Sequence, residues 1–502
     1  MNAEQILLAQ EAAVLSTISD FLYSYWLIYV LVGAGLFFTI ATKGVQVRHF
    51  GRMWKAIVAR EEAAGGISSF QAFATGMASR VGIGNIVGVA IALTLGGPGA
   101  IFWMWVVAFL GMATGFVEAT LAQVFKVRNA DGSYRGGPAY YIKTGLKQRW
   151  LAIVFAVVLT FTYGFAFNMV AANTISDTLN TNHGVPQWVT AIALMLLGAP
   201  LLLRGIRPIA RFSARYMPII AGLYVLIALG IVLFNVGQLP EILGLIFRSA
   251  FGLDEAVVGF GAGILAAMLN GTKRGLFSNE AGMGSAPNMA ATATVSHPVK
   301  QGLIQSVGVF IDTMIVCSAT AFMILSSGAY DLSNIGDSSV GAALTNAAIV
   351  TSLGDWASWL TSFIVFAFAF TTIFGNYSYA EVNLNYLGVH GRGIIAFRLL
   401  VILGVGLGSI LALATVWDVA DVVMALMATV NLISITLLFG WFRGTLKDYE
   451  GRVGTERINE RFVGQGNPLL PGDVPGDVWA EGAKDHQAEV AAVTAPGDQS
   501  GR

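Results

Sequence analysis

The chain alternates between long apolar stretches and short polar ones, which is the pattern of repeated membrane helices. A helix needs about 20 mostly apolar residues to cross the hydrocarbon core of a bilayer. Stretches of that kind predict an all-α membrane protein with about eleven transmembrane helices. The predicted spans are roughly 22–42, 68–93, 99–125, 150–172, 186–204, 215–237, 255–295, 303–326, 356–378, 393–415 and 417–442.

Lys and Arg residues gather in alternate loops between these spans. With eleven spans, the loops 43–67, 126–149, 204–215 and 296–302 lie on one side of the membrane and hold most of the basic residues, whereas the opposite loops hold only Arg248. Because loops rich in Lys and Arg stay in the cytoplasm, we expect the N-terminus outside the cell and the C-terminus inside.

These features divide the chain into five segments. Residues 1–21 are predicted as an N-terminal segment outside the cell, and residues 22–67 as an additional span with its cytoplasmic loop. Residues 68–237 and 238–443 form two sets of five helices. Because five is odd, the second set enters the membrane from the opposite face, which predicts an inverted repeat. Residues 444–502 are polar and rich in Gly, Pro, Asp and Glu, and are predicted as a disordered cytoplasmic tail.

A pair of glycines interrupts the first helix of each set. Gly82 and Gly84 flank Ile83, and Gly282 and Gly284 flank Met283. Glycine weakens a helix by about 1 kcal/mol relative to alanine. One interpretation is that these glycines are packing contacts, since small residues line membrane helix interfaces. The matched positions in two inverted halves favour a second interpretation. In this interpretation the glycines interrupt two helices that face one binding site, as in secondary transporters.

A broken helix offers both kinds of backbone charge to a ligand. The N–H groups that start a half-helix suit a carboxylate, and the carbonyl groups that end one suit an ammonium group or a hard cation. A small zwitterion together with Na⁺ fits both. Side-chain oxygens near the breaks would complete the site, and Phe277 and Met283 would form its walls. The polar candidates are Asn85, Ser278, Asn279, Thr371 and Thr372. For the two threonines the alternative is a hydrogen bond to a carbonyl in the preceding turn.

Ionisable residues inside predicted spans are costly and usually functional. Glu280 lies in the second break, where it would either pair with a nearby cation as a gate or carry a proton. Asp312 and Glu118 would be functional groups or buried structural hydrogen-bonding groups. Lys273 and Arg274 are expected on the outer side of the second break. The full set is Arg80, Glu118, Lys273, Arg274, Glu280 and Asp312.

Composition narrows the function further. Hydrophobic residues make up 55% of the 502 residues and charged residues only 12%. The net charge is zero, so nothing indicates a nucleic-acid partner. Cys317 is the single cysteine, which excludes an internal disulfide framework and a cysteine-cluster metal site. The sequence has no P-loop, no H-E-x-x-H and no G-x-S-x-G, so neither an enzyme nor ATP-driven transport is predicted. Nothing in it resembles the filter loop of a channel.

Several stretches resemble the alanine/glycine:cation symporter family of the amino acid–polyamine–organocation transporters. The resemblance covers about residues 65–445. It is carried most specifically by the run GLFSNEAGMGSAP at 275–287, together with GIGNIVGVA at 82–90, GGPGA at 96–100, GGPAYYI at 136–142, HP at 297–298, GVFIDT at 308–313 and TTI at 371–373.

The resemblance implies a LeuT-like fold of five plus five helices with one additional span. It implies a carrier, expected in the bacterial inner membrane as a monomer without a cofactor, that takes up alanine or glycine with Na⁺ or sometimes H⁺. In this sequence, the implied substrate positions are Gly82, Ile83, Gly84, Ala171, Phe277, Ser278, Asn279, Gly282 and Met283. The implied Na⁺ positions are Ala78, Val81, Asn85, Thr371 and Thr372, and those for gating or coupling are Arg80, Arg274, Glu280 and Asp312.

Two positions depart from the family pattern. Ile83 stands where Thr is common, and Ala171 stands where a substrate-facing Gln is common. These differences leave the expected fold unchanged but alter the implied substrate pocket. The alternative is an H⁺-coupled symporter with a different or bulkier amino acid as its substrate.

Overall fold

The computed structural model describes residues 14–15, 17–59, 67–129, 132–253, 263–331, 341–411 and 413–482, and nearly all of them are helical. The sheet formed by these residues is a short antiparallel hairpin in which Val127 pairs with Arg135. As far as residue 234, the elements are η1 (Tyr23–Leu27), α2 (Ile28–Ala41), α3 (Val45–Arg48), α4 (Phe50–Val58), α5 (Ser69–Arg80), η2 (Gly84–Gly88), α6 (Val89–Gly96), α7 (Gly99–Val124), β1 (Val127–Arg128), β2 (Tyr134–Arg135), α8 (Pro138–Thr144), α9 (Arg149–Phe161), η3 (Thr162–Ala166), α10 (Phe167–His183), α11 (Gln187–Leu202) and α12 (Ile206–Phe234). The later elements are η4 (Val236–Gln238), α13 (Leu239–Ala250), α15 (Ile264–Asn279), α16 (Ala286–Thr292), α17 (Pro298–Val309), η5 (Phe310–Cys317), α18 (Ser318–Ser326), α19 (Gly341–Leu353), α20 (Ala357–Tyr386), α21 (Arg392–Gly408), α22 (Leu413–Leu437), α23 (Phe439–Arg452) and η8 (Glu456–Asn459).

Among the described residues, 7 helices are long and apolar enough to cross a bilayer, or 8 if the bent pair Ser69–Arg80 and Gly84–Gly96 is one span. Each of the eleven predicted spans contains a helix, but α11 and α21 have only 16 and 17 residues. The prediction of a helical membrane protein is confirmed, and the number eleven stays a prediction. The long helices are Thr17–Ala41, Gly99–Val124, Arg149–His183, Ile206–Phe234, Pro298–Ser326, Ala357–Tyr386 and Val416–Leu437.

Both predicted interruptions are present. The first lies between α5 and η2, where the helix axis bends by 45°. The second lies between α15 and α16, where the φ angles of Glu280, Gly282 and Gly284 are 58°, 97° and 78°. Left-handed φ values are easily adopted only by glycine. The glycines at 282 and 284 therefore allow the chain to leave one helix and start another within a few residues.

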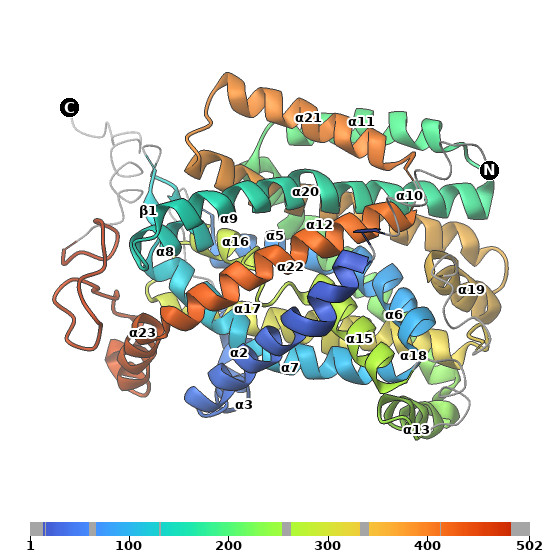
Figure 1. Ribbon diagram of the computed structural model, residues 1–502, viewed down its shortest axis with the longest axis horizontal. Helices are drawn as coiled ribbons and strands as arrows, with labels where there is room; N and C mark the ends of the chain where they lie inside the picture. The colour runs from blue at the N-terminus through green and yellow to red at the C-terminus, as the bar shows by residue number, and fades with distance from the viewer. Residues whose placement is uncertain are drawn as a thin grey trace, which may run out of the picture.

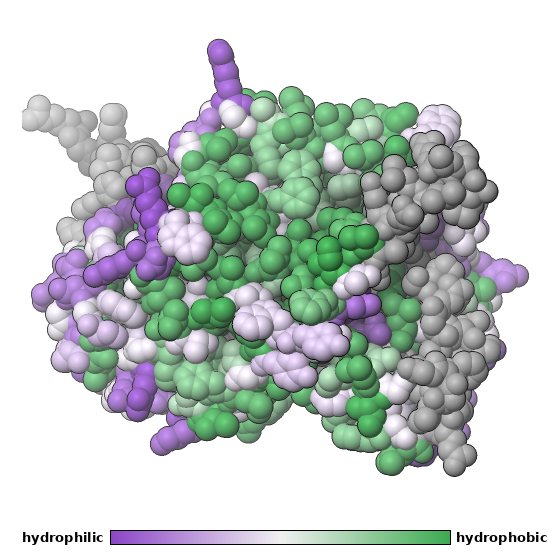
Figure 2. Space-filling model, in the orientation of Figure 1, coloured by the Kyte–Doolittle hydropathy of each residue, from purple (hydrophilic) through white to green (hydrophobic). Residues whose placement is uncertain are grey.

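The broken helices lie inside the bundle and longer helices surround them. α5 packs against α12 and α20, and α16 packs against α7 and α20. Figure 1 shows both short helices behind the long, inclined α22. Apolar side chains gather over the middle of the molecular surface, and charged side chains gather at the end that carries α23 (Figure 2). This distribution is expected of a membrane protein whose middle contacts lipid and whose α23 end contacts water.

The C-terminal segment differs from its prediction. Residues 444–482 are folded against the bundle rather than disordered, because a few large apolar side chains in this polar stretch are buried. Trp479 is 2% exposed and its Nε1 donates to the carbonyl of Gln123 across 2.8 Å. The backbone N–H of Phe462 donates to Ser296 O across 2.8 Å. Residues 483–502 of the predicted tail, and 1–13 and 16 of the predicted N-terminal segment, lie outside the described residues.

His297 joins this C-terminal segment to the start of α17. Its Nδ1 accepts from the N–H of Val299 at 3.2 Å, so Nε2 carries the hydrogen and donates to Asp448 Oδ1 at 3.2 Å. Burial, together with the positive charges of Arg452 and Lys300, outweighs the effect of Asp448 and lowers the pKa of His297 to about 4. Burial alone would raise the pKa of Asp448, but its hydrogen bonds and the Arg452 charge hold that pKa at about 2.

We therefore expect acid to loosen residues 444–482. A detached His297 would bind a proton near its ordinary pKa of 6.5, whereas the packed one binds it near pH 4. The detached state holds more protons between these values, so the packed state loses up to about 3 kcal/mol as the pH falls from 6.5 to 4. Hydrogen exchange of this segment, corrected for its intrinsic pH dependence, measures the effect. His297→Asn keeps an N-cap acceptor without titrating, and should remove the pH dependence; the same acid response in this variant would contradict the assignment.

Candidate functional site

The two helix breaks, far apart in the chain, touch each other. A Cβ atom added to Gly84 would lie 3.0 Å from the Phe277 ring and 3.0 Å from the Cα atom of Ser278. Asn85 Nδ2 donates to Ser278 Oγ across 3.1 Å. These residues are buried. The structure thus brings the two interruptions together in the interior, as the paired glycines predict.

Oxygen atoms of α20 lie beside the first break. A Cβ atom on Gly82 would lie 2.2 Å from Thr372 Oγ1, so this hydroxyl directly faces the backbone of the break. Thr371 Oγ1 and Thr372 Oγ1 each donate to the carbonyl of Phe368 across 2.9 Å. The alternative of bonding to the preceding turn is therefore realised here. It uses the hydroxyl hydrogens and leaves oxygen lone pairs available to a cation.

The other predicted cation positions are Ala78, Val81 and Asn85. Only the first two offer carbonyl groups that a cation could use in this conformation. Val81 ends α5 and Ala78 lies in its last turn, where carbonyl groups carry partial negative charge. Asn85 does something else: its Oδ1 accepts from the N–H of Gly82 at 2.8 Å. The side chain of Asn85 therefore caps the broken backbone, and its oxygen is already engaged in this conformation.

Asp312 connects the two broken helices to a third helix. Its Oδ1 accepts from Asn85 Nδ2 at 2.8 Å and its Oδ2 accepts from Ser278 Oγ at 2.6 Å. Thr313 Oγ1 also donates to Oδ2, at 2.9 Å. A carboxylate with several donors satisfies its buried charge. Of the two interpretations left open by the sequence, this geometry favours a structural hydrogen-bonding group.

Glu118 of α7 holds the second break. Its Oε2 accepts from the N–H of Gly282 at 3.0 Å, and its Oε1 accepts from the N–H of Gly284 at 3.1 Å. Asn431 Nδ2 donates to the same carboxylate and also to the carbonyl of Gly282, at 2.9 Å for the latter. The N–H groups of Gly282 and Gly284 are therefore already occupied by a carboxylate of the protein in this conformation.

Glu280 lies between hydroxyl groups rather than beside a cation. Ser79 Oγ is 2.7 Å from Oε1 and Ser285 Oγ donates to Oε2 at 2.7 Å. Ser79 Oγ also lies 2.7 Å from the amide oxygen position of Asn376. Among the described residues, Glu280 is a member of none of the ion pairs that the structure forms. The predicted pairing with a cation is therefore absent from this conformation.

The site is closed on the side of α15. The ring of Phe277 lies 4.7 Å from that of Trp417, and the guanidinium of Arg274 lies 4.5 Å from the Trp417 ring. Arg274 pairs with Asp421 at 2.5 Å, and both side chains are buried. Lys273 Nζ pairs with Asp20 at 2.7 Å. The two basic residues are therefore held in contacts that cover the site on its α15 side.

The side of α16 is closed as well. Ile67 forms a parallel β-bridge with Ala293, which joins the start of one broken helix to the end of the other. Beyond the bridge, Arg398 Nη2 donates to Glu381 Oε2 at 3.2 Å and its Nη1 donates to the carbonyl of Leu203 at 2.6 Å. A cavity of about 230 Å³ opens at this end and is lined by both Arg398 and Glu381. With both sides closed, this conformation is occluded.

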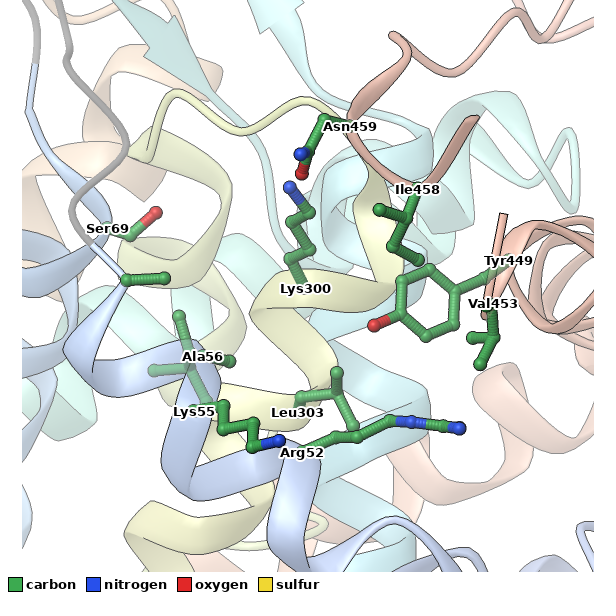
Figure 3. Close-up of a pocket in the computed structure, with 13 residues that line it drawn as sticks. Arg52, Lys55, Ala56, Ser69, Lys300, Leu303, Tyr449, Val453, Ile458 and Asn459 are labelled. Atoms are coloured by element: carbon green, nitrogen blue, oxygen red, sulfur yellow. The ribbon is translucent and has the colours of Figure 1, made fainter. Parts of the chain in front are cut away.

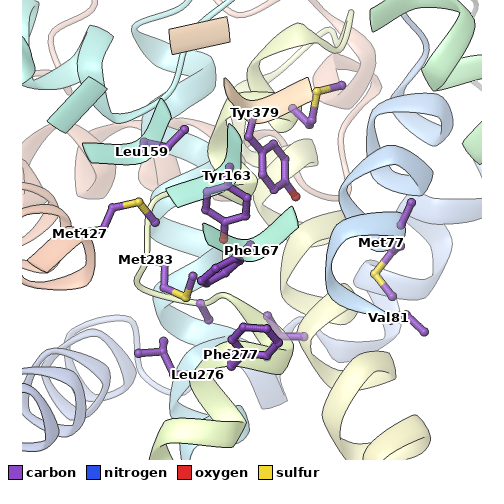
Figure 4. Packing of buried hydrophobic residues seen from close by; sticks show 14 of the residues in the cluster. Met77, Val81, Leu159, Tyr163, Phe167, Leu276, Phe277, Met283, Tyr379 and Met427 are labelled. Carbon is purple, nitrogen blue, oxygen red and sulfur yellow. The ribbon is translucent and has the colours of Figure 1, made fainter. Parts of the chain in front are cut away.

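The remaining predicted substrate positions surround the breaks to different degrees. Figure 4 shows Phe277 beside Phe167 of α10, and their ring centroids are 4.8 Å apart. Ala171 lies one turn beyond Phe167 on the same helix and is buried, as is Met283. Phe277 is thus the apolar wall that the structure places directly at the first break.

Two predicted polar positions, Asn279 and Arg80, are occupied by local contacts. Asn279 Oδ1 accepts from the N–H of Ala281 at 3.0 Å, which caps the end of α15. Arg80 Nη2 donates to Gln305 Oε1 at 2.8 Å, and Ile83 is buried just before η2. These contacts hold the breaks in shape in the occluded conformation.

Several site residues are absent from the sequence-based set. Asp421 lies inside the predicted span 417–442, so the argument that marks Glu118 and Asp312 applies to it too. Asn431 lies in the same span, and its Oδ1 accepts from the hydroxyl of Tyr141. Ser79 carries no comparable signal, because a serine in an apolar helix usually bonds to its own backbone.

The chain also matches known proteins. Residues 8–462 match the model of the sodium:alanine symporter family. The chain belongs to this family. The predicted resemblance is confirmed, and so is the prediction of a transporter rather than an enzyme.

Two relatives of this symporter come from Bacillus subtilis (strain 168). It is 46% identical over 431 residues to the amino-acid carrier protein AlsT, covering 86% of this chain and 90% of the relative. It is 44% identical over 435 residues to the probable sodium/glutamine symporter GlnT, covering 86% of this chain and 89% of the relative.

Among solved structures, the symporter is similar to MhsT, crystallised in complex with L-phenylalanine. The TM-score is 0.55 at 14% identity, and the similarity covers 74% of this chain and 88% of that one. Such a likeness shows the fold alone. The predicted LeuT-like fold is thereby confirmed.

Proposed function

We propose that this symporter carries a small neutral amino acid of the alanine type into the cell together with Na⁺. The observation that carries the proposal is the contact of two interrupted helices beside the Thr372 hydroxyl, which lies against Gly82. The family description names sodium and alanine. A substrate between the breaks would be shielded from water on both sides, as alternating access requires.

The arrangement of oxygens supports a cation as partner. The Thr372 hydroxyl and the Phe368 carbonyl lie beside Gly82, which directly follows the C-terminal end of α5, and the Thr371 hydroxyl bonds to the same carbonyl. Na⁺ prefers oxygen ligands, and a helix C-terminus adds partial negative charge. We propose that Na⁺ binds the free lone pairs of the two hydroxyl oxygens, while their hydrogens stay donated to the Phe368 carbonyl.

The size of the substrate is limited by close packing. Gly84 approaches Phe277 and Ser278 so closely that a single added methyl group would contact both. This favours a short side chain. A relative 44% identical is named a probable sodium/glutamine symporter, so glutamine is the natural competitor to include. Glu280, buried between two hydroxyls, is the observation that favours H⁺ coupling as the second candidate.

Uptake of labelled alanine into proteoliposomes tests the proposal. We expect accumulation with an inward Na⁺ gradient, little without one, and competition by unlabelled alanine and glycine more than by glutamine. Accumulation that is independent of Na⁺ but follows an inward H⁺ gradient would replace Na⁺ coupling with H⁺ coupling. Absence of alanine uptake, with uptake of another labelled amino acid, would overturn the substrate.

Thr372→Val should weaken the response to Na⁺. The change preserves shape but removes one proposed ligand oxygen, and we expect the Na⁺ concentration for half-maximal uptake to rise about tenfold or more. Thr361→Val is the matched control, because Thr361 is buried in the same helix and bonds to the Ala357 carbonyl at 3.0 Å. If both variants show the same Na⁺ dependence, Thr372 is not a ligand.

A further inference from the structure

The C-terminal segment is bonded to the end of α16, the half-helix that closes one side of the site. Trp479 is buried, and its Nε1 donates to the main-chain oxygen of Gln123 at 2.8 Å. The side chain of Gln123 reaches the end of α16, where its Nε2 donates to the carbonyl of Ala293 at 3.0 Å and also to that of Ala290. Gln123 therefore connects Trp479 to the residue that forms the β-bridge with Ile67.

A buried lysine makes the same connection. Lys126 Nζ donates to the Ala293 carbonyl at 2.9 Å. It also lies over two aromatic rings, 5.0 Å from the ring centroid of Trp479 and 4.1 Å from that of Tyr134. An ammonium group is attracted to an aromatic face, and the attraction is larger where water is excluded. Removing the Trp479 ring would therefore loosen both Lys126 and Gln123, which donate to one carbonyl.

The same segment contacts the connection between α16 and α17 at a second place. The N–H of Phe462 donates to Ser296 O at 2.8 Å. The rings of Phe462 and Trp479 are 5.5 Å apart, so the two contacts belong to one packed unit. Further along, Tyr449 of α23 and Leu303 of α17 line one cavity (Figure 3). The segment thus follows the chain from the end of α16 into α17, and a movement of that end would disturb its contacts.

We propose that Trp479 is a positioning residue for transport, which acts through Gln123 and Lys126 to hold the end of α16 in the closed conformation. These two side chains bind the Ala293 carbonyl, and opening on this side has to move Ala293 away from Ile67. Contacts that are lost on opening favour the closed conformation by their own free energy. The C-terminal segment therefore acts as a latch, and its docking sets how often the site opens on the α16 side. Neither the amino acid nor the coupling ion takes part, so this role can be measured without them.

The single cysteine of the chain reports on this closure. Cys317 is buried beside the breaks, with its Sγ 3.2 Å from Ser278 Oγ, so a thiol reagent reaches it only when one side opens. The test adds a membrane-impermeant maleimide, without substrate, to the vesicle face that carries the C-terminal segment. We expect Trp479→Ala to be alkylated about tenfold faster than the wild type from this face, as for the loss of about one hydrogen bond, and at the wild-type rate from the opposite face. Trp479→Phe keeps a ring but loses the N–H donor, and its rate should lie between the two.

Trp441→Ala is the matched control, because Trp441 of α23 also packs near the end of α7, with its ring 5.2 Å from that of Phe125. We expect its alkylation rate to stay close to the wild type. An equal rise in both alanine variants, a rise of Trp479→Ala from both faces, or no rise at all would overturn the proposal. If Trp479→Ala does not fold, Trp479→Phe is compared instead. If Cys317 reacts in no variant, hydrogen exchange of residues 290–296 decides: it should be faster than in Trp441→Ala, and equal exchange would contradict the latch.

Discussion

We expect Gly82→Leu to abolish uptake, because the first break has no room for a side chain at this position. Even the first carbon of the new side chain would lie 2.2 Å from Thr372 Oγ1 and 3.5 Å from Thr372 Cβ. Contacts this short force the break and α20 apart, and the rest of the leucine would enter the proposed substrate space. We expect labelled alanine uptake at background level, with the protein still present in the membrane. Normal uptake would remove the first break from the site.

Two controls separate transport from folding in this experiment. Gly230→Leu makes the same change in α12, where an added Cβ atom meets no atom within 4 Å, and should leave uptake unchanged. The pair Gly82→Ala with Thr372→Ala relieves the steric conflict but removes a proposed Na⁺ ligand. We expect this pair to recover the thermal stability lost in Gly82→Ala alone, without recovering uptake. Recovery of both would show that Thr372 contributes only packing.

The occluded conformation indicates what has to move during a cycle. On the α15 side, opening must separate Arg274 from Asp421 and shift Trp417 from Phe277. On the α16 side, it must break the bridge between Ile67 and Ala293. Both closures join a broken helix to a neighbouring segment. A ligand that binds both breaks can therefore bias either closure without contacting it directly.

The positions of the breaks could be predicted from sequence because glycine acts locally. Gly282 and Gly284 adopt φ values that other residues avoid. Two glycines separated by one residue are therefore a direct sequence signal of the break. The resemblance to a known family also predicted the LeuT-like fold. Neither source indicated that Glu118 would bind the freed N–H groups, because that contact joins residues 164 and 166 positions apart and depends on how α7 packs.

For the C-terminal segment, the prediction from composition was wrong. Its average composition predicts disorder, yet Phe462 and Trp479 are buried and their ring centroids lie 5.5 Å apart. The average composition is dominated by many polar residues. It therefore does not reveal these two large apolar residues, which are buried near the end of α7. Single aromatic residues in a polar stretch are therefore the signal that the average hides.

Glu118→Ala should remove transport almost as completely as the change at Gly82. The wild-type carboxylate satisfies the N–H groups of Gly282 and Gly284 and the amide of Asn431. Hydrogen bonds to a charged acceptor contribute more than neutral ones, and an unsatisfied buried donor costs about 1–3 kcal/mol. Removing the acceptor leaves several donors unsatisfied, so the free energy of unfolding should fall by about 3 kcal/mol or more and uptake should fall at least a hundredfold.

Glu118→Gln tells whether the charge or only the shape matters. The glutamine amide offers one acceptor oxygen, but its NH₂ group would face another donor, so one backbone N–H of the break loses its partner. We expect uptake well below the wild type but above that of the alanine variant. Glu450→Ala is the control, because that carboxylate is 31% exposed and pairs with Arg48 near the surface, where ion pairs contribute little. Wild-type uptake by Glu118→Ala would mean that the second break keeps its shape without this carboxylate, and the site would then have to be built around the first break alone.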